Sequence, residues 1–207
     1  MFHADIQEDK HGALVAVARL MAAAGVEYVI TGGLAAQLHV SQPRFTLDVD
    51  IVLRPEDEVA VREAITRSPF REQFELVHVR RRWTALVHRD TGTPIDINSS
   101  RLFTRLLEDP QPIDLEDDII PFAAPLWVAY SKLRTQQGRW PRAVDKRLID
   151  RADLIRLLRD NPGLYEDLRA RVDGDMLDML DAVRAESKQS DELPPYPDDD
   201  EADPPVK

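Results

Sequence analysis

The sequence V-I-T-G-G-L-A-A at residues 29–36 is followed, after a gap, by L-D-V-D-I-V-L at residues 47–53. The first stretch predicts a short strand, two glycines and the start of a helix. The second alternates apolar and acidic residues, which is the period of a strand. Because residues two apart in a strand project from the same face, we expect Asp48 and Asp50 to point the same way, about 7 Å apart.

A third acidic position follows the same pattern. Asp96 lies between Ile95 and Ile97 in a predicted strand at residues 93–98. Converging carboxylates repel one another unless a cation lies between them. Carboxylate oxygens suit Mg²⁺ or Mn²⁺, and three of them on neighbouring strands are typical of sites that transfer phosphoryl groups with bound metal ions. The alternatives are a solvated strand face for Asp48 and Asp50, and a loop contact for Asp96.

Gly32 and Gly33 lie between a predicted strand and a predicted helix. Without side chains, their amides can approach a phosphate closely, and the helix directs its positive end toward the same point. The alternative is a glycine turn that serves the chain path alone.

The order of these motifs resembles the nucleotidyltransferase superfamily, which has the polymerase-β-like fold. The sequence R-F-T-L-D-V-D at residues 44–50 resembles AbiEii-type toxins of bacterial toxin–antitoxin and abortive-infection systems, which are related to MenT-type toxins. A lysine, Lys132, followed by D-R-A-D at residues 150–153 is similar to a pattern in the helical half of those proteins.

The resemblance implies an enzyme that uses Mg²⁺ (or Mn²⁺) to move NMP from an NTP to an acceptor hydroxyl, with release of pyrophosphate. It makes tRNA the leading acceptor and implies a cognate antitoxin as partner. Asp48, Asp50 and Asp96 would bind metal, and Asp96 would also act as the general base or orient it.

Further roles follow from the same resemblance. Gly32 and Gly33 would cradle the nucleotide phosphates, and Arg44 and Thr46 would hold the triphosphate or the acceptor. Lys132 would neutralise phosphate charge, with Asp150 fixing Lys132 or another cation in place. The alternative for Lys132 is a solvated helix face.

The fold expected is α/β (α+β): a small mixed β-sheet nucleotidyltransferase core at residues 1–105, a helical C-terminal region at 106–186 and a disordered acidic tail at 187–207. Strands are predicted at 27–30, 47–53, 74–79, 83–88 and 93–98, and helices at 12–24, 34–39, 55–67, 127–137, 145–159 and within 164–186. Prolines between residues 110 and 125 indicate a connecting stretch. The tail has seven acidic and two basic residues, five prolines and no periodic apolar pattern.

Composition excludes several classes of protein. The 207 residues contain no Cys, which removes disulfide scaffolds, thiolate metal sites and cysteine nucleophiles. The acidic N-terminus does not resemble a signal peptide, and no apolar run approaches the length that crosses a bilayer. A cytoplasmic protein with no membrane association is therefore expected.

The net charge of −11 disfavours nucleic acid as a partner, but the sequence R-R-R-W at residues 80–83 offers a local exception. It could contact an RNA backbone and stack a base on Trp83, or it could form a solvated hairpin tip. Two further functions stay open. One is nucleotide transfer to a small molecule or protein, and the other is a catalytically silent nucleotide-binding module.

Overall fold

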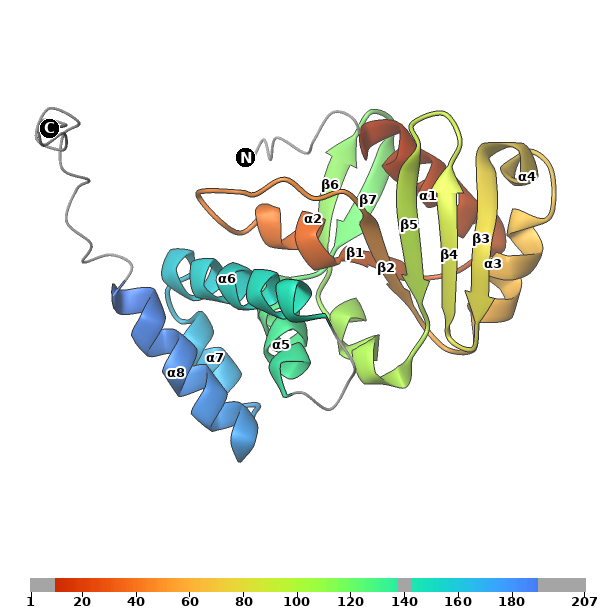
Figure 1. The fold of residues 1–207 in the computed structure, drawn as a ribbon. Helices are drawn as coiled ribbons and strands as arrows, with labels where there is room; N and C mark the ends of the chain where they lie inside the picture. The colour runs from red at the N-terminus through yellow and green to blue at the C-terminus, as the bar shows by residue number, and fades with distance from the viewer. Residues whose placement is uncertain (1–9, 138–142, 190–207) are drawn as a thin grey trace, which may run out of the picture.

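The computed structural model describes residues 10–137 and 143–189. Within them, seven strands form one mixed sheet in the order β3-β4-β5-β2-β1-β7-β6 (Figure 1). The strands are β1 (Tyr28–Thr31), β2 (Val49–Leu53), β3 (Phe74–Arg80), β4 (Trp83–His88), β5 (Thr93–Asn98), β6 (Gln111–Leu115) and β7 (Asp118–Phe122). The expected mixed α/β fold is confirmed.

The register of the central strands brings the acidic motifs together. β2 runs parallel to β5, with Asp50 opposite Asp96, and antiparallel to β1, with Asp50 opposite Thr31. β5 pairs on its other side with β4, and β4 pairs with β3. The D-x-D strand therefore lies between the glycine-bearing strand and the strand with the third acid.

Helices cover one face of the sheet, and a further group of helices lies beside one end of it (Figure 1). Behind the sheet lie α1 (His11–Ala24) and α3 (Glu58–Ile65), which contact each other. The remaining helical elements are α2 (Gly32–Gln37), α4 (Phe70–Gln73), the 3₁₀ helix η2 (Arg101–Leu107), α5 (Pro125–Gln136), α6 (Val144–Asp160), α7 (Leu164–Arg169) and α8 (Asp175–Gln189).

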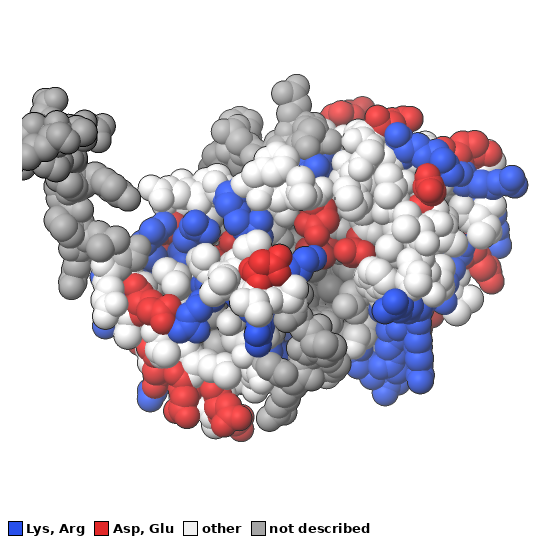
Figure 2. Space-filling view, viewed as in Figure 1, with Lys and Arg blue, Asp and Glu red and all other residues white. Residues whose placement is uncertain are grey.

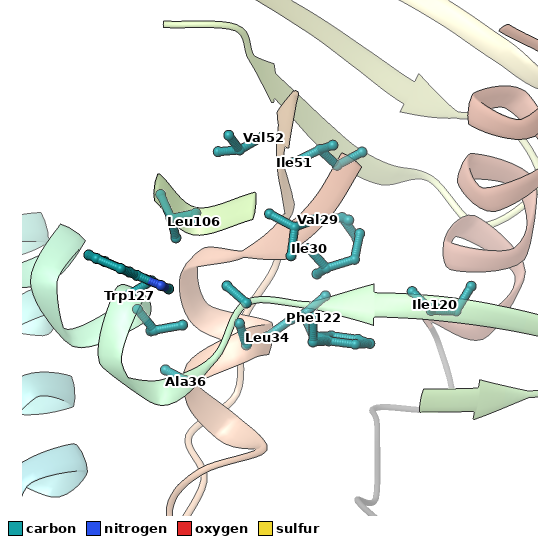
Figure 3. Close-up of a cluster of buried hydrophobic side chains, with 14 of the residues drawn as sticks. Val29, Ile30, Leu34, Ala36, Ile51, Val52, Leu106, Ile120, Phe122 and Trp127 are labelled. Carbon is teal, nitrogen blue, oxygen red and sulfur yellow. The ribbon is translucent and has the colours of Figure 1, made fainter. Parts of the chain in front are cut away.

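Buried apolar side chains connect the sheet to the helical part. Ile30 and Ile51 from the sheet, Leu106 from η2 and Trp127 from α5 belong to one continuous buried cluster (Figure 3). The same cluster continues to Leu180 in α8. Burial of this surface holds α5 and η2 beside the strands that carry the acids.

The proline-containing stretch expected as a connection forms a hairpin instead. β6 and β7 pair antiparallel with Pro112 opposite Pro121, and β6 is the edge strand of the sheet. β7 joins β1 through a single residue pair, Ile30 with Phe122. Proline has no N–H to donate to a neighbouring strand, so within sheets it is tolerated mainly in edge strands. Because prolines usually argue against a strand, the sequence pattern did not predict β6 and β7.

Two other boundaries differ from expectation. Leu47, predicted as the first residue of the strand at 47–53, precedes β2 and is 68% exposed. Residues 187–189, expected in the acidic tail, form the end of α8, and the rest of that tail lies outside the described residues. The division of the chain at residue 105 stays a prediction. In the described part of the chain, no helix combines the length and the apolar character that crossing a membrane requires.

Candidate active site

Three carboxylates meet at the cavity face of the central strands. Asp48, Asp50 and Asp96 each offer one oxygen atom, and these three atoms lie within 4.8 Å of one another. Asp50 and Asp96 are opposite each other on β2 and β5, and Asp48 directly precedes β2. The Thr46 hydroxyl donates a hydrogen bond of 3.1 Å to Asp48 Oδ1, which orients that side chain.

Two carboxyl groups of this cluster have raised pKa values. Burial, together with the charges of Asp48 and Asp96, raises the pKa of Asp50 to about 7. Burial and Asp48 likewise raise the pKa of Asp96. Lys132 and Lys146 oppose the rise at Asp50 but do not cancel it. Three hard oxygen donors whose mutual repulsion is incompletely neutralised fit a divalent cation such as Mg²⁺ or Mn²⁺.

Gly32 makes room for this cluster. Its φ of +65° lies in the left-handed region, and a Cβ atom there would lie 1.8 Å from Asp50 Oδ2. A Cβ atom on Gly33 would lie 2.5 Å from the Thr46 hydroxyl oxygen. Both glycines are therefore required by the site's own side chains, while their predicted contact with nucleotide phosphates stays a prediction.

A buried network of charges lies beside the acids. Lys132 on α5 is 4% exposed, and its Nζ lies 3.2 Å from Asp150 Oδ1 and 2.8 Å from Asp153 Oδ2, both on α6. Arg44 donates two hydrogen bonds to the same Asp153 carboxylate, at 2.8 and 2.9 Å. Asp150 also accepts a hydrogen bond of 3.0 Å from the Thr135 hydroxyl.

Asp153 is the centre of this network. Burial alone would raise the pKa of its carboxyl, but hydrogen bonds and charge from Arg44 and Lys132 lower that pKa below its ordinary value. The sequence reasoning gave no role to Asp153, although the D-x-x-D spacing was visible. Its hydrogen bonds tie the segment before β2 to α5 and α6.

A cavity of about 280 Å³ contains the cluster. Helices α5 and α6 contribute Lys132, Lys146, Asp150 and hydroxyl groups to its lining, and β4 and η2 contribute Trp83 and Phe103. Figure 2 shows acidic side chains gathered near the centre of this face, with basic ones beside them.

All nine predicted site residues lie in or around this cavity. Six of the nine belong to its lining: Gly32, Asp48, Asp50, Asp96, Lys132 and Asp150. Thr46 contacts Asp48, Arg44 contacts Asp153, and Gly33 packs against Thr46. The sequence pattern assigns no role to Lys146 and does not place Trp83 in the lining of this cavity.

Comparison with solved structures identifies the fold. A crystal structure of an antigenic nucleotidyltransferase-like protein from Paracoccidioides brasiliensis matches with a TM-score of 0.53 and 18% identity, covering 85% of this chain and 94% of that one. The chain has a nucleotidyltransferase fold. The antibiotic-resistance factor ANT(2'')-Ia matches with a TM-score of 0.45 and 10% identity, covering 87% of this chain and 94% of that one.

Sequence comparison adds nothing to this likeness. No protein-family model matches the chain, and no curated protein sequence matches it.

Removing one acid from the cluster should stabilise the protein in the absence of metal. We expect Asp50→Asn to raise the melting temperature in EDTA at pH 8, because a half-buried carboxylate beside two others is replaced by a neutral side chain of the same shape. Mg²⁺ should raise the melting temperature of the parent and much less that of the variant. Thermal unfolding with and without Mg²⁺ measures both effects. The exposed Asp114→Asn on β6 serves as control and should behave as the parent does.

Two glycine variants can separate the steric clash with Asp50 from the strain of a left-handed backbone. Gly25 has a φ of +68° with nothing within 4 Å of an added Cβ, whereas Gly32 has a similar φ and the contact with Asp50. Both Gly25→Ala and Gly32→Ala should lose about 1–2 kcal/mol of unfolding free energy through the left-handed backbone alone. Only Gly32→Ala should lose Mg²⁺-dependent stabilisation. Equal Mg²⁺ responses in the two variants would contradict the crowding argument.

Asp153 should stabilise the fold in a pH-dependent manner. Its folded pKa lies below its unfolded value of 3.8, so its contribution is complete at neutral pH and is lost as the pH falls through the folded pKa. Asp153→Asn should cost about 3 kcal/mol at pH 7, and the difference from the parent should shrink in acid. Urea unfolding at pH 7 and at pH 3 tests this, with the exposed Asp145→Asn of the same helix as control.

Proposed function

We propose that the protein is a divalent-metal-dependent nucleotidyltransferase that moves NMP from an NTP to an acceptor hydroxyl and releases pyrophosphate. The observation that carries this proposal is the triad of Asp48, Asp50 and Asp96, whose oxygen atoms lie within 4.8 Å in a cavity that also presents two lysines. The nucleotidyltransferase fold of the chain is consistent with it.

In the proposed reaction, the acceptor oxygen attacks the α-phosphorus of the NTP. The new oxygen–phosphorus bond forms as the bond from the α-phosphorus to the bridging oxygen of the β-phosphate breaks. Pyrophosphate leaves with that electron pair. The hydroxyl proton passes to the Asp96 carboxylate or to a base that Asp96 orients.

The chain supplies groups for each part of this chemistry. Asp48, Asp50 and Asp96 would hold the metal ion, which when bound offsets their negative charge and that of the phosphates. Lys132 and Lys146, which line the same cavity, would bind the triphosphate, with Lys132 fixed in place by Asp150 and Asp153. Gly32 and Gly33 keep the space open in which the acids and the phosphates meet.

We further propose that the acceptor is tRNA and that the protein acts as the toxin of a bacterial toxin–antitoxin or abortive-infection system. The resemblance of residues 44–50 to AbiEii-type toxins supports this. Arg44 of that motif contacts Asp153 of the buried charge network, and Thr46 contacts Asp48 of the triad. The motif therefore forms part of the site. In such a system a cognate antitoxin would restrain the enzyme.

The decisive experiment incubates the protein with each α-labelled NTP, Mg²⁺ and total tRNA, beside the Asp48→Asn variant. We expect label on tRNA from the parent and background label from the variant, because the variant lacks one carboxylate of the triad. The exposed Asp114→Asn should label tRNA as the parent does.

Other outcomes of this experiment correct the proposal in distinct ways. Asp48-dependent label on the protein itself or on an added aminoglycoside would replace tRNA with another acceptor. Metal-dependent NTP binding without any labelled product would show a binding module and overturn the proposed transfer. Growth arrest by the expressed parent but not by Asp48→Asn would support the toxin assignment, and unimpaired growth with both would contradict it.

A further inference from the structure

One side chain of the cavity belongs to the β3–β4 hairpin and has no place in the reaction as described above. Trp83 begins β4 and lies opposite Asn98 of β5, while Ala85 lies opposite Asp96. Residues two apart in a strand share a face, so Trp83 is a diagonal neighbour of Asp96 on the cavity side. The Trp83 indole N–H donates a hydrogen bond to the Asp96 carboxylate.

The hairpin surrounds this ring with cationic and aromatic groups. The Trp83 ring centroid lies 5.4 Å from that of His78 and 5.8 Å from the Arg80 guanidinium carbon. Arg80 Nε also donates a hydrogen bond of 2.6 Å to His78 Nε2. The ring therefore contacts the acid triad through its N–H and the basic hairpin through its π-system.

The turn of the hairpin is held in place. Arg82 has a φ of +63°, and its backbone N–H donates to Glu58 Oε1 at 3.1 Å. The other carboxylate oxygen of Glu58 accepts a hydrogen bond of 2.8 Å from the Ser99 hydroxyl. Arg81 is exposed in this anchored turn, two residues before Trp83, which lines the cavity.

The charge of this hairpin opposes that of the whole chain. Three consecutive arginines, Arg80 to Arg82, occur in a protein whose net charge is −11. Figure 2 shows basic side chains gathered at the end of the molecule where the β3–β4 hairpin turns in Figure 1. Two lysines from the helical part, Lys132 on α5 and Lys146 on α6, also line the cavity. Basic side chains from both the hairpin and the helices are thus available near the triad, which suits a reaction with two polyanionic substrates.

We propose that Trp83 is the platform on which the terminal nucleotide of a single-stranded RNA acceptor stacks, with the hairpin arginines binding its backbone phosphates. An indole ring stacks on any base, and arginines beside it add charge contacts along the strand. In this arrangement the acceptor enters from the β4 side and its 3′-hydroxyl reaches Asp96, while the NTP binds the two lysines. The N–H bond to Asp96 makes Trp83 a positioning residue for that acid as well.

The experiment that tests this proposal has a binding arm and a catalytic arm. The catalytic arm rests on the proposed function, whereas the binding arm needs no nucleotide transfer. The binding arm measures fluorescence anisotropy of a labelled short single-stranded RNA with a free 3′-hydroxyl. We expect Trp83→Leu to raise the Kd by about 10-fold to 100-fold, the loss of one base stack, and Trp83→Phe to bind nearly as the parent does. Arg81→Gln should lower the slope of log K against log salt by about 0.7, and the exposed Arg71→Gln should leave it unchanged.

The catalytic arm separates the two roles of Trp83. Trp83→Leu should raise the KM for the RNA acceptor and leave the KM for the NTP unchanged. Trp83→Phe keeps a stacking ring but lacks the N–H bond to Asp96, so it should lower kcat with little change in the acceptor KM. Circular dichroism and melting temperatures of both variants show that they remain folded.

Several results would overturn this assignment. One is an unchanged Kd for RNA in folded Trp83→Leu, and another is an effect of that variant on the KM for the NTP instead of the acceptor. Transfer of label to a protein acceptor without Trp83-dependent RNA binding would also contradict it. Trp83-dependent RNA binding without nucleotide transfer would uphold the platform and refute the proposed function, which keeps the two claims distinguishable.

Discussion

Repulsion among three half-buried carboxylates is the constraint on which the rest of the site depends. The parallel pairing of β2 with β5 places Asp50 opposite Asp96, and the residue before β2 adds Asp48, so the sheet itself creates the crowding. Apolar burial across the sheet, η2 and α5 supplies the free energy that keeps these acids together.

The helical part contributes charge as well as apolar surface. Lys132 and Arg44 come from segments far apart in the sequence, and Asp153 of α6 contacts both. A buried carboxylate with two cationic partners is far less tolerant of displacement than an apolar contact, because each lost partner leaves an uncompensated charge. The position of α6 relative to the loop before β2 is therefore specified by charge in addition to packing.

Much of the core could be predicted from the sequence because local patterns determine it. Strand periodicity located β2, β4 and β5, and the D-x-D spacing followed from the two-residue repeat of a strand. The hairpin of β6 and β7 could not be predicted, because its prolines remove the signal that marks strands. The role of Asp153 and the position of Trp83 depend on contacts between distant segments, which no local pattern encodes.

The contact between Gly32 and Asp50 has a consequence for how sequences with this fold can diverge. A side chain at position 32 would occupy the space of the Asp50 carboxylate, so the two positions cannot change independently. A lineage that retains the acid must retain the glycine, whereas a lineage that has lost the acid is free to lose the glycine too. The residue at position 32 of a homologous chain therefore reports whether that chain still has room for the acid.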